Sequence, residues 1–297
     1  MKSFGKNILA LSVMLASATT GSAAMASSTT LVSITPQKIV GNDNSADISL
    51  SKGGLQAVFE SDATNLVLQD GNNAMDIFHR VGTRITRVSV NSLGQEGKNS
   101  KADWFDGNNF AESTNAAISS DGKLVVFQSQ ADNLDRLTAD TNNGNGSETD
   151  IFLRDVVKKK TYRLSGIMDG ADGSITAGQL DVDGNDIAST EEAWKVMTQG
   201  NDQSTNPFIA GTLKQAWVSF QSEATNLSTI ATTANRSHIY VVDLKTKKIE
   251  LVSATHDAAG NVLAEGNDNS RNAVISPAGR FGVYESDANN LVFFFIY

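Results

Sequence analysis

The chain has 297 residues, a formal net charge of −9 and no cysteine. Hydrophobic residues make up 40% of it and charged residues 19%, which is enough apolar material for a core and not the composition of a disordered chain. The negative charge argues against a nucleic-acid partner, and the lack of cysteine excludes disulfides, thiolate catalysis and zinc–thiolate sites.

Residues 1–26 are typical of a secretory signal peptide. Their start carries two lysines, residues 8–18 are mostly apolar, and residues 24–26 form a small-x-small cleavage pattern. The apolar stretch is well short of the roughly 20 residues that span a bilayer, which disfavours a membrane anchor. We therefore expect cleavage after Ala26, with Ala24 as the alternative, and a periplasmic or secreted bacterial protein without a transmembrane segment.

An eight-residue pattern recurs four times along the rest of the chain. Each copy begins with an aromatic residue followed by Glu or Gln and Ser, and it ends with Asn-Leu. The copies begin 68, 93 and 64 residues apart, so the repeating unit carries loops of variable length. We expect structural roles for the shared residues, with the asparagine holding a turn. These shared residues are the aromatics Phe59, Phe127, Phe220 and Tyr284, the serines Ser61, Ser129, Ser222 and Ser286, and the asparagines Asn65, Asn133, Asn226 and Asn290.

The flanks of the pattern also repeat, and they predict a unit of four short strands. A turn and a strand precede each aromatic residue, and two further strands follow the pattern. The third strands begin with Ile and an aromatic residue at 76–78, 150–152 and 238–240, and the fourth end at 87–89, 163–165 and 251–253. Four short strands joined by turns are the content of one propeller blade.

The ends of the mature domain, residues 27–297, predict one split blade. Residues 31–33 match the end of a fourth strand, but the first three strands of such a unit do not precede them. A fourth strand in this place closes a propeller ring when it pairs with the last blade and completes it. The C-terminal part supplies two strands, at 273–275 and 281–286, before the apolar tail 292–297. We expect three full blades plus a split, incomplete blade closed by the N-terminal strand.

The apolar tail indicates a truncated or frame-shifted product. The alternative is a compact form in which the tail itself serves as the third strand of the last blade. An unfinished sheet exposes an unpaired edge, so truncation predicts a chain that is prone to association.

Two of these segments resemble a known class of repeats. The Ser-x-Asp-Gly-Lys turn at residues 119–123, the Val-Phe strand after it and the strand at 150–152 resemble the TolB-like, WD-type β-propeller repeats of bacterial exported proteins. The resemblance covers residues 28–291 apart from one insertion. It implies an all-β protein, a β-propeller of four-stranded antiparallel blades that serves mainly as an interaction platform, although such propellers also occur as domains of enzymes. There is no room for the separate N-terminal α/β domain of TolB, so a role in the Tol envelope system is not implied.

The insertion, at about residues 166–204, carries the most pointed chemical pattern. Asp181, Asp183, Asn185 and Glu192 have the spacing of positions 1, 3, 5 and 12 of an EF-hand-type loop, whose hard oxygen ligands converge on one Ca²⁺ ion. Position 6 is not the glycine that the sharp turn of such a loop needs. The spacing makes these four residues the candidates for a Ca²⁺ site, and an acidic, solvated surface loop is the interpretation that the missing glycine favours.

A second acidic pattern precedes the predicted third strand of two units. Asp70 leads through two asparagines to Asp76, and residues 140–143 lead in the same way to Asp150. Such loops have the oxygen atoms to hold a cation, but Asx-turns account for the same residues without one.

The sequence offers no recognisable catalytic set. Its histidines, His79, His238 and His256, are scattered, and it has no Gly-x-Ser-x-Gly elbow, phosphate-binding glycine-rich loop or His-Glu-x-x-His motif. A binding or scaffold module for a protein or glycan partner is therefore favoured over the alternative, a hydrolase acting on glycans or peptides. Three or more carboxyls with raised pKa around the propeller axis would favour the hydrolase.

Overall fold

The structure is a computed structural model, and it describes residues 10–15, 26–98, 111–135, 148–168, 196–257 and 259–291. The regular structure in these ranges is β-strand, apart from the single 3-10 turn η1 (Lys52–Gly54). They contain no helix that is long and apolar enough to cross a membrane. The all-β class predicted from the sequence is confirmed.

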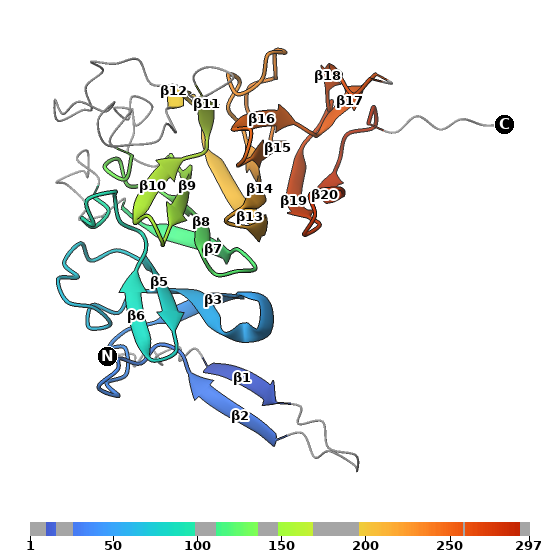
Figure 1. The fold of residues 1–297 in the computed structure, drawn as a ribbon. Helices are drawn as coiled ribbons and strands as arrows, with labels where there is room; N and C mark the ends of the chain where they lie inside the picture. The colour runs from blue at the N-terminus through green and yellow to red at the C-terminus, as the bar shows by residue number, and fades with distance from the viewer. Residues whose placement is uncertain are drawn as a thin grey trace, which may run out of the picture.

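Three four-stranded antiparallel sheets form the body of the molecule, and in each the strands pair in chain order (Figure 1). The first contains β3 (Ser45–Leu50), β4 (Gln56–Ser61), β5 (Asp76–Val81) and β6 (Arg84–Arg87). The second contains β7 (Ser113–Ile118), β8 (Leu124–Ser129), β9 (Asp150–Asp155) and β10 (Lys160–Arg163). The third contains β13 (Ser204–Thr212), β14 (Gln215–Ser222), β15 (His238–Asp243) and β16 (Lys248–Leu251). The predicted four-stranded blades are confirmed.

The registers of the three sheets are equivalent. In each, the signature aromatic of the second strand pairs with the aromatic of the third strand, and the two rings stack with centroids 5.7–5.9 Å apart. All six rings are fully buried. The pairs are Phe59 with Phe78, Phe127 with Phe152, and Phe220 with Tyr240. Equivalent residues of the repeat thus take equal positions in the three sheets, although the copies are unequally spaced in the sequence.

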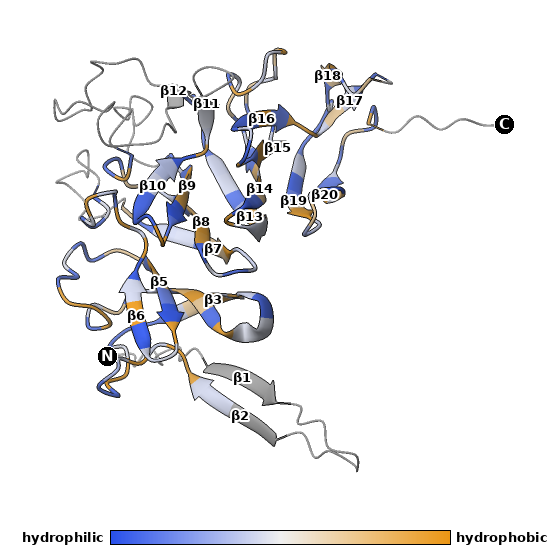
Figure 2. Cartoon of the chain, in the orientation of Figure 1, coloured by the Kyte–Doolittle hydropathy of each residue, from blue (hydrophilic) through white to orange (hydrophobic). Residues whose placement is uncertain are grey.

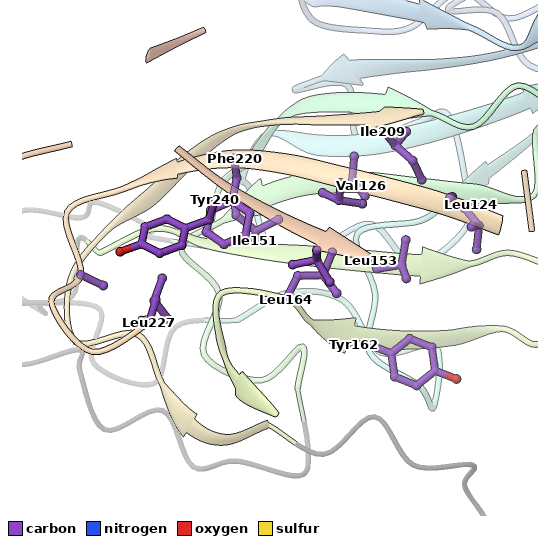
Figure 3. Close-up of a cluster of buried hydrophobic side chains, with 14 of the residues drawn as sticks. Leu124, Val126, Ile151, Leu153, Tyr162, Leu164, Ile209, Phe220, Leu227 and Tyr240 are labelled. Atoms are coloured by element: carbon purple, nitrogen blue, oxygen red, sulfur yellow. The ribbon is translucent and has the colours of Figure 1, made fainter. Parts of the chain in front are cut away.

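Successive sheets pack face to face along an open arc (Figure 1). The middle strands of the first two sheets are mostly buried on both faces, and Figure 2 shows hydrophobic residues along β8. At the first junction, Ile77 and Val88 share one buried cluster with Phe127 and Phe152. At the second, the residues equivalent to these four share another cluster (Figure 3): Ile151, Leu164, Phe220 and Tyr240.

An antiparallel hairpin precedes each of the four units. The four hairpins are the bridges Ile34–Val40 and Val90–Glu96, the pair β11 (Gly166–Met168) and β12 (Val196–Gln199), and the pair β17 (Ala254–His256) and β18 (Val262–Glu265). The insertion expected at about 166–204 therefore starts and ends in the third of these hairpins. Its middle, residues 169–195, lies outside the described residues.

Among the described residues, the N-terminal strand does not pair with the last unit. β2 (Ala26–Leu31) pairs with β1 (Ala10–Leu15), while β19 (Ser270–Ile275) and β20 (Gly282–Ser286) form a separate two-stranded sheet at the other end of the arc (Figure 1). This corrects the expected closure of the split blade by the N-terminal strand. A partner that follows after a short loop costs less closure entropy than one at the far end of the chain. Residues 292–297 lie outside the described residues.

Candidate functional site

The asparagine of each signature copy fastens the connecting hairpin to the sheet. The Nδ2 of Asn133 donates to the carbonyl of Glu96 (2.9 Å), and its Oδ1 accepts the N–H of Lys98 (2.8 Å), so the side chain brackets Gly97. The same pair of bonds is made by Asn65, Asn226 and Asn290 around Gly41, Gly200 and Gly266. Each asparagine thus binds a segment more than 20 residues upstream, and not only its own turn.

The signature serines join the first two strands of every unit. The hydroxyl of Ser129 bonds to that of Ser113 (2.9 Å) and accepts the N–H of Ala131 (3.1 Å). The other three units repeat the serine pair at the same distance: Ser45 with Ser61, Ser204 with Ser222, and Ser270 with Ser286. Because both hydroxyls are buried or nearly so, the bond satisfies groups that would otherwise be costly to bury.

The acidic pattern before β5 surrounds an arginine. Arg87 lies 2.9 Å from both Asp70 and Asp76 and 3.1 Å from Glu96. Burial raises the pKa of Asp76, and it raises the pKa of Asp70 to about 6, although Arg87 acts in the opposite direction on both. The arginine thus compensates one of three clustered carboxylates.

The other units keep this cluster but change its members. In the second, Asp150 is paired with Arg163 and accepts a bond from Gln199 at 3.0 Å, while residues 140–143 lie outside the described residues. In the third, His238 replaces the aspartate and its Nε2 lies 2.9 Å from Glu265. Burial lowers the pKa of this histidine. Across the described part of the chain, no group of three or more His, Asp or Glu side chains is placed to hold a metal.

A second polar group lies where the second strand of one sheet meets the first strand of the next. The carboxylate of Glu60 accepts the backbone N–H of Asn115, and Gln128 in the next sheet accepts that of Asn206 (2.9 Å). Both asparagines have left-handed φ angles, 52° and 51°, at a bulge in the first strand. Burial raises the pKa of Glu60 to about 7.

The histidines lie apart from one another. His79 in β5 contacts Gln56 (2.8 Å), and burial lowers its pKa to about 4. His238 lies in the cluster of the third unit, and His256 lies in β17. The structure therefore brings no pair of histidines together. The residues predicted to bind Ca²⁺ lie outside the described residues: Asp181, Asp183, Asn185 and Glu192.

An apolar groove lies between the third sheet and the β19–β20 pair. It is a groove of about 490 Å³ whose floor includes Trp217, Ile239 and Val252, and whose other wall is formed by β19 and β20. Phe281 and Val283 on that wall are 69% and 68% exposed. Figure 2 shows that the C-terminal half of β19, at this groove, is hydrophobic. The sequence analysis predicted two strands, at 273–275 and 281–286, on this side, but the groove itself depends on how two units pack.

Tyr284 anchors this wall to the third sheet. Its hydroxyl donates to the carbonyl of Val252 (3.3 Å), and burial raises its pKa. Trp217 lies under the β19–β20 turn, where a side chain on Gly279 would overlap the indole ring. The groove is therefore bounded by two aromatic residues held in place by backbone contacts.

No protein-family model matches the chain, and no curated protein matches it. Similar solved structures include a protein of Agrobacterium tumefaciens assigned as TolB (12% identity, TM-score 0.35, 81% of this chain and 59% of that one) and TolB of Acinetobacter baumannii (10%, 0.26, 84% and 56%). A third is the tricorn protease (11%, 0.31, 83% and 24%). The chain thus spans less than two thirds of the length of each.

Proposed function

We propose that this chain is an exported β-propeller-type binding module that holds a protein partner in the groove between the third sheet and β20. The observation that carries the proposal is the apolar groove of about 490 Å³ with Phe281 and Val283 exposed beside it. Contiguous exposed apolar surface on a water-soluble protein marks interaction sites, and aromatic residues are the commonest anchors of such sites.

The rim of the groove has the composition of a protein interface. Asp243 and Glu250 lie on the side of the third sheet with Lys248, and Arg280 lies on the opposite wall. An apolar centre with a charged rim excludes water from the centre and sets orientation at the edge. An apolar centre fits a polypeptide better than a glycan, whose many hydroxyls need polar partners when they are buried.

The carboxyls with raised pKa favour the scaffold over the hydrolase. Asp70 and Asp76 contact Arg87, and Glu60 accepts the N–H of Asn115 at the junction of two sheets. Each carboxyl thus has a partner that accounts for its position within the fold. The hydrolase hypothesis predicts instead three or more carboxyls with raised pKa gathered around the propeller axis.

Export is supported by the pattern of residues 1–26 alone. Fractionation of the bacterium that carries the gene tests it directly. We expect the shortened, mature chain in the periplasm or the medium, and full-length chain in the cytoplasm would contradict it.

Site-specific cross-linking tests the binding function. Phe281 is replaced by a photo-reactive phenylalanine analogue in cells of the native bacterium, and the same analogue at Val157, which is 59% exposed and far along the chain, is the control. We expect protein adducts at position 281 and none at position 157. Equal yields at both positions, or none at either, would contradict a partner in this groove.

A further inference from the structure

The junctions between successive units follow one rule. The isoleucine of a third strand and the apolar residue before the last serine of the unit face two aromatics of the next unit. At the first junction these are Ile77 and Val88 against Phe127 and Phe152, which lie in one buried cluster. At the second they are Ile151 and Leu164 against Phe220 and Tyr240, again in one buried cluster (Figure 3).

The third junction contains only part of this arrangement. Ile239 and Val252 occupy the positions of Ile77 and Val88, and Tyr284 occupies that of Phe127. The position that Phe152 takes at the first junction belongs to a third strand, and the groove opens at the corresponding place beside Tyr284. The groove therefore has the lining that receives the aromatic residue of a third strand in the other units.

The backbone at the groove is also arranged to receive a third strand. In the three complete sheets the second strand pairs on both sides, with the first and the third strand. Within the described residues β20 pairs only with β19, and no described strand pairs with its other edge, which lies next to the groove. A free edge beside an apolar pocket is the arrangement that receives an added strand, with the backbone giving affinity and the pocket giving specificity.

We propose that the partner binds by inserting an extended segment as a third strand, antiparallel to β20, with an aromatic side chain opposite Tyr284. This rests on the proposed function and specifies its partner. The chain itself supplies the pattern, because β5, β9 and β15 place Ile and then Phe or Tyr at their second and third residues. The aromatic side chain enters the groove toward Ile239 and Val252, and the preceding Ile points away from the third sheet, because side chains alternate along a strand.

The proposal is tested with a peptide that copies a third strand of this chain, residues 149–156, labelled with fluorescein. Its fluorescence anisotropy is measured as the full chain is added. We expect saturable binding that weakens at least tenfold when Phe152 of the peptide is changed to Ser. Hydrogen exchange should show the amides of residues 282–286 slowing when the peptide is added.

The groove is tested with a matched pair of variants. Val241→Arg places a charge in the groove lining, and Val157→Arg places the same charge on an exposed turn far from it. We expect peptide binding to be lost in the first variant and unchanged in the second. If Val241→Arg does not fold by circular dichroism, Val283→Glu on the exposed wall replaces it, and the same loss is expected.

Several results would overturn strand addition. They are equal binding by both variants, binding without slower exchange at residues 282–286, and no binding of the peptide. Slow exchange there before peptide is added would show an occupant from the same chain, and a concentration-dependent dimer that the peptide dissociates would show a second copy. Adducts at Phe281 without peptide binding would remove strand addition and keep the binding function. Peptide binding without adducts would show that the groove accepts a strand but holds no partner in the cell, which overturns the proposed function and, with it, strand addition by a partner.

Discussion

Gly97 lies directly against Ala131, so that a Cβ at position 97 would come within 3.0 Å of the Cβ of Ala131. Gly97 belongs to the hairpin that follows the first sheet, and Ala131 belongs to the signature of the second. Asn133, two residues beyond Ala131, brackets the same glycine with two hydrogen bonds. The Ala of the signature thus packs against the glycine of the hairpin, and the Asn binds the backbone on either side of that glycine.

Gly97→Ala should lower the free energy of unfolding by about 1–3 kcal/mol, because it overpacks this contact. Gly71→Ala is the matched control, because its new Cβ would be 3.9 Å from the nearest atom, and we expect a change within about 0.5 kcal/mol. Urea unfolding measures both variants. Adding Ala131→Gly to Gly97→Ala should recover part of the loss, and purely additive effects would contradict the contact.

Glu60→Gln should remove a pH dependence of stability. The pKa of Glu60 is raised to about 7 from an ordinary value of 4.5, so the unfolded chain loses this proton first. The contribution of Glu60 is therefore most favourable below pH 4.5, and it falls as the pH rises towards 7. Allowing for solvent screening, we expect a fall of about 1–2 kcal/mol.

The measurement is the free energy of unfolding at a series of pH values in both proteins. The difference between them isolates Glu60 from other carboxyls with raised pKa, such as Asp62 and Asp70. Glutamine keeps the acceptor oxygen, as Gln128 shows in the next sheet, so the variant should fold. Parallel curves would show that Glu60 is not the titrating group.

Arg87→Leu should destabilise the chain by about 3–5 kcal/mol, because it leaves Asp70 and Asp76 buried without their cation. The third unit has His238 and Leu251 at the positions of Asp76 and Arg87. Combining Asp76→His with Arg87→Leu should therefore recover part of the stability. Thermal unfolding compares the two variants, and a double variant less stable than the single one would contradict the equivalence of the units.

Ca²⁺ should raise the melting temperature of the mature protein, because the spacing of Asp181, Asp183, Asn185 and Glu192 predicts a binding loop. Asp181→Ala should abolish the rise. Asp186→Ala, at a loop position that supplies no ligand side chain, should keep it. An equal response of the wild type and Asp181→Ala would remove this loop as a Ca²⁺ site.

The signature predicted the sheets because it records local requirements. A buried strand needs apolar residues on both faces, and the aromatic at Phe59, Phe127 and Phe220 meets its partner at the same register each time. Serine and glycine positions could be recognised in the same way. What the signature does not record is which distant backbone atoms the asparagine reaches, since Asn133 and Lys98 are 35 residues apart.

The candidate site was less accessible to sequence analysis. The groove depends on Trp217 and Tyr284 from different units meeting across a junction, and no local pattern specifies that meeting. The predicted ring closure is not seen among the described residues. Residues 31–33 lead into the hairpin that precedes the first unit, and β2 pairs with β1, which belongs to the segment 1–26 that the sequence predicts to be removed on export.

Hydrogen exchange of individual amides tests the central claim, that β20 is the equivalent of β4, β8 and β14 but has one open edge. In the purified chain alone, we predict slow exchange along Gln56–Ser61, Leu124–Ser129 and Gln215–Ser222, and fast exchange at alternate amides of Gly282–Ser286. Uniformly slow exchange in all four strands would contradict the open edge, and fast exchange in all four would contradict the paired sheets themselves.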